Sequence, residues 1–213
     1  MRNDICLSIG HLGYSEILEQ LEKAALAEIR IDLLSLRKNE LTTIFSQHKN
    51  LIATYRTNDD FAQMEKVLTL AMSIGCAYID IDINTPEYYR KKLIETARGK
   101  GCKVILSYHN FTETPSTNDL EKVVNNLFEL GANIAKVACK ANTPSDCARI
   151  MGLYDNAKNL VAFCMGEIGM ITRLAAPILG APFTYAAIDS KETAPGQLNL
   201  RDTTSILKKI AGK

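Results

Sequence analysis

The sequence predicts a single (β/α)8 barrel, a TIM barrel of the α/β class, that spans residues 1–213. Short apolar runs typical of strands alternate with amphipathic helical stretches along the whole chain. The eight strand–helix units are about 25 residues each, which is the period of this barrel. No linker, low-complexity tract or break in composition divides the chain into domains. Because periodicity alone does not show that a sheet closes, an open doubly wound sheet remains the alternative.

Each expected strand is a short, mostly apolar run bounded by turn residues. In chain order the strands are expected at Ile5–Ile9, Glu28–Leu34, Leu51–Arg56, Ala77–Ile83, Lys103–His109, Ile134–Cys139, Leu160–Met165 and Phe183–Ala187.

The expected helices carry apolar residues on one face and begin or end at known signals. Glycines at positions 75, 101, 131 and 180 follow or close helices, where a left-handed cap suits glycine. The pairs Thr85-Pro86 and Thr143-Pro144 match an N-cap followed by a first-turn proline. The helices are expected at Ser15–Ala25, Lys38–His48, Phe61–Ile74, Pro86–Gly99, Thr117–Leu130, Thr143–Asn156, Ile168–Leu179 and Leu200–Ala211.

Composition narrows the class of protein. A chain of 213 residues can bury enough surface to fold without a metal or disulfide. The net charge of +1 and the absence of a basic block predict no nucleic-acid partner. No apolar run is long enough to span a bilayer, which predicts no membrane partner. The six cysteines form no CxxC pair, and the chain starts in a strand without a signal peptide, so we expect a reduced cytoplasmic protein.

In a (β/α)8 barrel, function lies at the carboxyl ends of the strands and in the loops that follow them. Residues spaced by two on a strand share a face, and this groups Glu28, Arg30 and Asp32 on the second strand. The other polar or loop-forming candidates at these positions are Arg56, Asp80, Asp82, Ser107, Tyr108, His109, Lys136, Met165 and Gly166.

Lys136 is a lysine inside an expected buried strand, with apolar neighbours on both sides. Burial disfavours the charged ammonium and so favours a neutral amine. Such an amine can add to a ketone and form an electron-withdrawing iminium. The equally weighted alternative is a structural lysine near the barrel mouth, paired to a carboxylate such as Asp80 or Glu28.

His109 ends the fifth expected strand, next to the strand that carries Lys136. Histidine titrates near neutral pH, so it can take and return a proton within one catalytic cycle. The alternative is a capping or core histidine, but the neighbouring lysine favours a shared cavity.

Arginines at strand ends suggest an anionic substrate. Arg30, Arg56 and Arg173 could each bind a carboxylate with two hydrogen bonds. Phosphate-binding glycine motifs are missing from the sequence. The segment Thr193–Gln197 follows the last strand at the barrel mouth, and either Glu192–Gln197 or Thr112–Thr117 could close as a lid.

A metal site is a competing interpretation of the acidic residues. Asp80 and Asp82 share a face, and Glu28 and His109 could join them across the barrel. The three histidines lie far apart, without HxH or HExxH spacing, so we expect no metal.

Six sequence motifs, in order along essentially the whole chain, resemble one family. They are Glu28-Ile-Arg30-Ile-Asp32, Thr54-Tyr-Arg56, Ser107-Tyr-His109-Asn-Phe, Ala135-Lys136-Val, Met165-Gly166 with Ile171-Thr-Arg173-Leu, and Ala194-Pro-Gly-Gln197. The chain thereby resembles the type I 3-dehydroquinate dehydratases. The resemblance implies a barrel enzyme of the shikimate pathway that dehydrates 3-dehydroquinate to 3-dehydroshikimate without a cofactor, as a homodimer.

The resemblance also implies roles for individual residues. Lys136 would form the Schiff base, and His109 would act as acid and base. Arg173 would hold the substrate carboxylate, and Gln197 would belong to the loop that closes over the site. The remaining substrate-binding or pocket-lining residues would be Glu28, Arg30, Arg56, Met165, Tyr185, Thr193 and Ser8.

The chain departs from the family pattern at three points. Thr193 stands where serine is expected, which keeps the hydroxyl. The glutamate that usually orients the histidine shortly after the third-strand arginine is absent, so Asp60, Asp59 or Glu28 is expected to serve. The N-terminal segment that often covers the barrel floor is also expected to be missing.

Two other functions remain open from the residues. One is a class I aldolase-type barrel, which would also use a strand lysine but usually needs a phosphate site. The other is a catalytically silent barrel that binds a small anion. The joint presence of Lys136 and His109 favours an enzyme.

Overall fold

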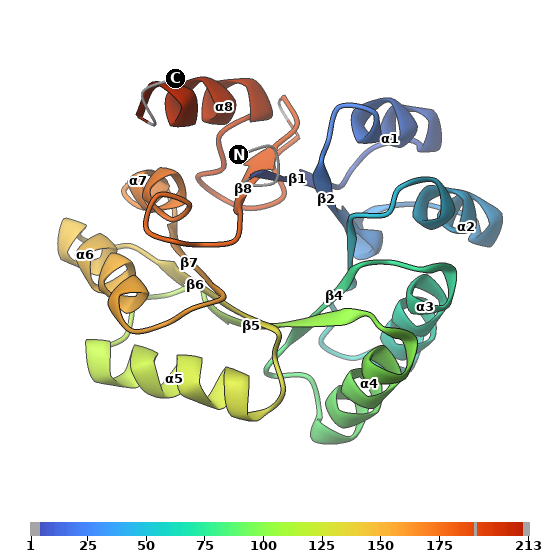
Figure 1. The fold of residues 1–213 in the computed structure, drawn as a ribbon, viewed down its shortest axis with the longest axis horizontal. Helices are drawn as coiled ribbons and strands as arrows, with labels where there is room; N and C mark the ends of the chain where they lie inside the picture. Colours follow the sequence, from blue (N-terminus) through green and yellow to red (C-terminus); the bar gives the residue numbers. More distant parts are fainter. Residues whose placement is uncertain (1–4, 190, 211–213) are drawn as a thin grey trace.

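The computed structural model describes residues 5–189 and 191–210, and it has eight parallel strands surrounded by helices (Figure 1). The strands are β1 (Ile5–Ile9), β2 (Leu26–Arg30), β3 (Leu51–Thr54), β4 (Tyr78–Asp82), β5 (Lys103–Asn110), β6 (Ile134–Lys140), β7 (Leu160–Met165) and β8 (Thr184–Ala187). The hydrogen-bonded order is β7-β6-β5-β4-β3-β2-β1-β8, with every paired neighbour parallel.

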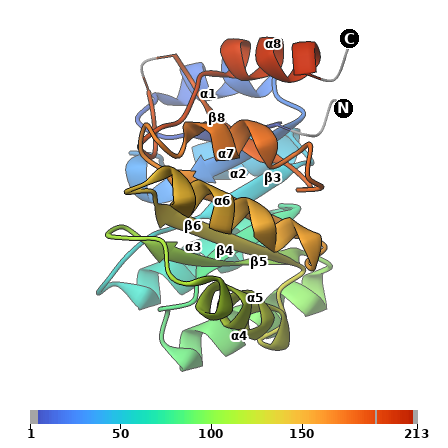
Figure 2. The same cartoon turned by 90° about the vertical axis from the view of Figure 1, so that its left-hand side faces the viewer.

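This order makes a nearly closed barrel with β7 and β8 at the two ends of the ladder. The helices pack outside the strands in chain order, as Figure 1 and the side view in Figure 2 show. They are α1 (Tyr14–Leu21), α2 (Lys38–Gln47), α3 (Phe61–Ile74), α4 (Glu87–Lys100), α5 (Thr117–Glu129), α6 (Pro144–Gly152), α7 (Met170–Ala175) and α8 (Leu200–Ile210). The predicted (β/α)8 class is confirmed, and the open doubly wound sheet is wrong.

Alternation along the strands builds two apolar layers. Residues such as Ile79 and Ile81 face outward and pack under the helices in the larger cluster. Residues such as Ile52 and Ile105 face inward and fill the barrel below the pocket. The inward positions nearer the carboxyl ends include Glu28, His109 and Lys136, so charged and titratable side chains gather at one end of the barrel.

Helix ends follow the predicted signals closely. Gly75 and Gly101 adopt φ angles of +115° and +68° and close α3 and α4, a conformation that suits glycine. Pro144 is the first residue of α6, as predicted, whereas α4 begins at Glu87 with Pro86 as its N-cap. The last predicted helical residue, Ala211, lies outside the described residues.

Several predicted elements extend past the observed ends, and the second strand and the seventh helix show why. The second strand ends at Arg30 because Ile31–Leu33 turns into a 3-10 helix, so Asp32 leaves the strand face and pairs with Arg30 at 2.7 Å. Helix α7 ends at Ala175, and near its end the carbonyl of Arg173 accepts a hydrogen bond from the Thr184 hydroxyl.

No helix within residues 5–189 and 191–210 is long and apolar enough to cross a membrane.

Candidate active site

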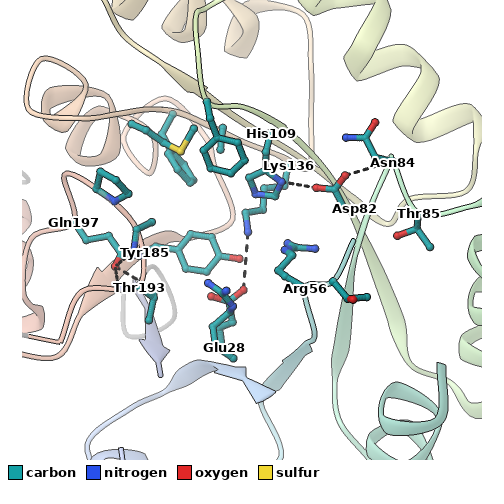
Figure 3. A pocket seen from close by; sticks show the side chains of 18 of the residues that line it. Glu28, Arg56, Asp82, Asn84, Thr85, His109, Lys136, Tyr185, Thr193 and Gln197 are labelled. Carbon is teal, nitrogen blue, oxygen red and sulfur yellow. Dashed lines mark hydrogen bonds and ion pairs between the residues drawn. The ribbon is translucent and has the colours of Figure 1, made fainter. Parts of the chain in front are cut away.

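A cavity of about 630 Å³ opens at the carboxyl ends of the strands. Figure 3 shows side chains from opposite walls pointing into it. Of the residues predicted for the site, the structure brings ten together around this cavity: Glu28, Arg30, Arg56, His109, Lys136, Met165, Arg173, Tyr185, Thr193 and Gln197. Ser8 does not line the cavity; its fully buried side chain lies behind Glu28.

Lys136 lies in the middle of the site because β6 directs it inward. Its side chain is 7% exposed, and the Nζ atom lies 2.9 Å from Asp80 Oδ2 and 3.9 Å from Glu28 Oε1. The same atom stands 4.6 Å from the centre of the Tyr185 ring. The carboxylate pairing expected of a structural lysine is therefore present, and so is access to a cavity that could hold a ketone.

Asp80 anchors two cations beneath the cavity. Besides Lys136 it binds Arg56 Nη2 at 2.7 Å, and the Ser107 hydroxyl donates to it at 2.7 Å. Burial alone would raise the pKa of Asp80, but the charges of Arg56 and Lys136 outweigh burial and hold that pKa well below its usual range. Asp80 is thus a fixed negative charge that positions both cations.

His109 is held by Asp82, a residue of the neighbouring strand β4. Its Nδ1 donates to Asp82 Oδ2 at 2.6 Å (Figure 3), and Phe111 stacks on the ring at 5.9 Å. Burial lowers the pKa of His109. The hydrogen bond to Asp82 raises this pKa in part, and the positive charge of Arg56 lowers it further. The result is a neutral imidazole at neutral pH whose Nε2 is left to take a proton.

The expected source of this orienting carboxylate was wrong. Asp60 caps α3 by accepting from the Gln63 N–H at 3.0 Å, and Asp59 accepts from the hydroxyl of Thr57. These two side chains are committed to the start of a helix, as aspartates near an N-terminus commonly are.

Glu28 is also engaged elsewhere, because the hydroxyls of Ser8 and Thr54 donate to its two oxygens at 2.7 and 2.9 Å. The spacing of two between Asp80 and Asp82 already indicated that both face inward. The adjacency of β4 and β5 was the signal that could have paired Asp82 with His109.

Arg173 is a buried cation without a carboxylate. It is 3% exposed, its Nε and Nη1 atoms have no hydrogen-bond partner among the described residues, and its Nη2 donates to the Pro195 carbonyl at 3.2 Å. Its guanidinium stacks over Phe163 at 4.1 Å. Burial lowers the pKa of Arg173 to about 10. Arg30 and Arg56, in contrast, are paired with aspartates.

The loop after β8 closes one side of the cavity. Gln197 Oε1 accepts from the backbone N–H groups of Thr193 and Ala194 at 2.9 and 3.2 Å, and the Gly166 N–H donates to Pro195 at 3.3 Å. The other lid candidate, residues 112–117, does not line the cavity. The segment 191–197 is therefore the candidate lid.

Ten lining residues were not singled out as site candidates from the sequence. Most belong to loops after β3, β4, β5 and β8, where no strand alternation indicates which way a side chain points. They are Thr57, Asn58, Phe61, Asn84, Thr85, Phe111, Ala138, Phe163, Ala194 and Pro195.

No group of three or more His, Cys, Asp or Glu side chains in the described part of the chain is placed to hold a metal ion. The four acidic or imidazole groups considered for such a site are instead engaged with cations, with hydroxyls or with each other.

The fold and this cavity define a (β/α)8-barrel enzyme whose pocket holds a lysine, a histidine and an arginine that pairs with no carboxylate of the described residues. The model of the family Type I 3-dehydroquinase matches residues 5–213, and the chain belongs to this family.

Several relatives cover nearly the whole chain. The 3-dehydroquinate dehydratase of Pyrococcus abyssi is 37% identical over 203 residues, which are 91% of this chain and 92% of that protein. The enzyme of the same name from Dehalococcoides mccartyi is 32% identical over 97% of this chain and 95% of its own length.

A solved 3-dehydroquinate dehydratase from Aquifex aeolicus superposes with a TM-score of 0.82 at 28% identity, covering 97% of this chain and 98% of that one. The predicted family is therefore confirmed.

Proposed function

We propose that this protein is a 3-dehydroquinate dehydratase that removes water from 3-dehydroquinate through a Schiff base on Lys136. The hydro-lyase activity follows from its membership of the type I 3-dehydroquinase family and from relatives that carry this name. The product is 3-dehydroshikimate, which places the protein in the shikimate pathway toward aromatic amino acids. Elimination of water neither oxidises nor reduces the substrate, so its chemistry balances without a redox cofactor.

The proposal is supported most strongly by the buried, incompletely hydrogen-bonded guanidinium of Arg173. A buried guanidinium with two nitrogen atoms that have no partner among the described residues is costly unless a ligand completes it, and a carboxylate matches its donors with two parallel hydrogen bonds. Arg30 and Arg56 already have aspartate partners. Arg173 and Lys136 line the same cavity, so a substrate held by its carboxylate at Arg173 shares that cavity with the lysine.

Lys136 is the proposed nucleophile. Its Nζ lone pair attacks the ketone carbon, and the protons that the nitrogen loses are transferred to the ketone oxygen. Loss of the ketone oxygen as water leaves an iminium, which makes the adjacent C–H bond more acidic. Tyr185 and Met165 form apolar walls around this bond-forming step.

His109 is the proposed acid and base. Its Nε2 removes a proton from the carbon next to the iminium, and the electron pair becomes that of a neutral enamine. The enamine then expels the hydroxyl, which takes the proton back from His109 and leaves as water. Asp82 keeps Nδ1 protonated and the ring oriented through both transfers. Water finally hydrolyses the Schiff base and frees Lys136.

The proposal is tested by the absorbance of the conjugated enone product in the presence of 3-dehydroquinate. Lys136→Met should abolish turnover, whereas Lys140→Met, an exposed lysine at the end of the same strand, should leave it unchanged. A Lys136→Met variant with wild-type turnover would overturn the lysine mechanism. An inactive wild-type protein that binds the substrate would instead favour the anion-binding barrel.

We further propose that the protein acts as a homodimer in the cytoplasm, without nucleic acid or a metal. The near-neutral net charge of +1 supports the absence of a nucleic-acid partner. The six buried, free cysteines are compatible with a reducing compartment. Sedimentation of the purified protein would test the dimer directly, and a monomer at working concentrations would refute it.

A further inference from the structure

A chain of hydrogen bonds runs behind the pocket wall, from the loop after β8 to Glu28. Ser8 lies on β1, paired in register with Glu28 on one side and Ala187 on the other, and it is fully buried. Its Oγ donates to Glu28 Oε2 at 2.7 Å and lies 2.6 Å from Thr193 Oγ1. Ser8 therefore joins two residues that line the cavity, although it does not line the cavity itself.

The donors and acceptors in this chain of hydrogen bonds can be assigned, because each hydroxyl has a single proton to donate. An ionised carboxylate only accepts, so the single Ser8 proton goes to Glu28. The separation of 2.6 Å then requires the Thr193 hydroxyl to donate to Ser8. Gln197 Oε1 lies 3.2 Å from that hydroxyl, but the backbone N–H groups of Thr193 and Ala194 already supply it with donors.

The other end of the chain reaches the reacting lysine. Glu28 Oε1 accepts from Thr54 at 2.9 Å and faces the Nζ of Lys136 at 3.9 Å (Figure 3). Because one carboxylate plane contains both oxygens, holding Oε2 through Ser8 also fixes where Oε1 stands. If Thr193 moved away with its loop, the buried Ser8 oxygen would lose its donor, which is unfavourable.

We propose that Ser8 is a positioning residue that latches the loop 191–197 onto the Glu28 carboxylate. Loop closure and the placement of Glu28 beside Lys136 are then coupled through two hydroxyl groups. The consequence for turnover rests on the proposed dehydratase function, whereas the latch between loop and barrel does not.

Hydrogen exchange in the substrate-free protein tests the latch. The Gly166 N–H, which follows β7, donates to the Pro195 carbonyl of the loop at 3.3 Å, so its exchange reports loop opening, whereas the N–H groups of Thr193 and Ala194 donate to Gln197 within the loop. Ser8→Ala should speed the exchange of the Gly166 N–H about fivefold to tenfold, the effect of one lost hydrogen bond. Thr193→Val should do the same, and Thr193→Ser should keep the wild-type rate.

The double variant distinguishes a latch from two separate effects. With Ser8→Ala and Thr193→Val combined, exchange should be no faster than in either single variant, because both remove the same contact. Thr42→Val removes an exposed hydroxyl on α2 and should change nothing. Unchanged exchange in Thr193→Val, or effects that multiply in the double variant, would overturn the proposal even if Ser8→Ala folded poorly.

Kinetics separate the latch from the dehydratase. With 3-dehydroquinate, Thr193→Val should raise KM about fivefold, and Thr193→Ser should restore it. Wild-type protein without turnover but with the expected exchange pattern would leave the latch standing and remove the proposed function. Normal turnover, together with exchange rates that do not change in the Ser8 and Thr193 variants, would support the dehydratase function and refute the latch.

Discussion

Replacing Arg173 by methionine should stabilise the folded protein while weakening its binding of substrate. Burial lowers the pKa of Arg173 to about 10. Each pKa unit corresponds to about 1.4 kcal/mol, so burying this charge costs the folded state on the order of 3 kcal/mol. A lowered pKa disfavours the charged form in the folded protein. At pH 7 the side chain is charged in both states, and the whole cost applies.

Two contacts offset part of this cost. The stacking of Arg173 on Phe163 contributes about 1 kcal/mol, and the hydrogen bond to the Pro195 carbonyl about 1 kcal/mol more. Arg173→Met should therefore raise the free energy of unfolding by about 1 kcal/mol, measured by urea denaturation at pH 7. The same variant should lose about 10²-fold or more in kcat/KM, because it removes the partner of a buried carboxylate.

Arg56→Met is the matched control, because Arg56 is a pocket arginine that has a carboxylate. Removing it leaves Asp80 with one cation fewer in a buried site and should cost about 3–5 kcal/mol. If Arg173→Met lost as much stability as Arg56→Met, the Arg173 guanidinium would already be satisfied in the free protein. Arg173 would then need no substrate carboxylate to complete its hydrogen bonds.

Three further predictions follow from the site. Burial lowers the pKa of His109 below its ordinary value of about 6.5. As the pH is lowered, kcat/KM should therefore stay constant down to about pH 6.5 and fall only below it, when the imidazole becomes protonated. A decrease in kcat/KM that begins above pH 7 would contradict this. Asp82→Asn should lower kcat about 10²-fold in the enone assay, whereas Asp60→Asn should leave kcat unchanged; equal kcat losses would refute Asp82 as the orienting group. Gly196→Ala should lower kcat/KM and reduce the free energy of unfolding in urea by about 1–3 kcal/mol, because φ is +76° and a Cβ would lie 2.5 Å from the Gly166 carbonyl oxygen. Gly99→Ala, at a helical position with open space around it, should slightly raise the free energy of unfolding. A Gly196→Ala variant with unchanged activity and stability would exclude a tightly closed loop.

The barrel could be predicted because its signals are local. Apolar runs, helix-closing glycines such as Gly75 and first-turn prolines such as Pro144 each determine the structure of a few neighbouring residues. The end of β2 was missed because the spacing of two between Arg30 and Asp32 fits a continuing strand as well as the ion pair that the two side chains form at the turn Ile31–Leu33. The early end of α7 involves a hydroxyl from β8, which is distant in sequence.

In the candidate site, the inward strand residues could be predicted and their partners could not. Alternation and strand order brought Lys136 and His109 to one cavity. The carboxylate that binds His109 could not be predicted, because several aspartates lie near the strand ends. Asp60 caps the start of α3, whereas Asp82 accepts from the histidine. Ser8 was predicted among the substrate-binding residues from the sequence, whereas the structure buries it behind Glu28.

The proposed mechanism requires a covalent Schiff base between Lys136 and the substrate. The most direct measurement is to incubate the protein with 3-dehydroquinate, add borohydride, and determine the intact mass followed by peptide mapping. We expect a mass increase equal to one reduced adduct, located at Lys136 and absent from Lys136→Met. An unmodified protein that still produces the enone absorbance would contradict the lysine mechanism while leaving a dehydratase.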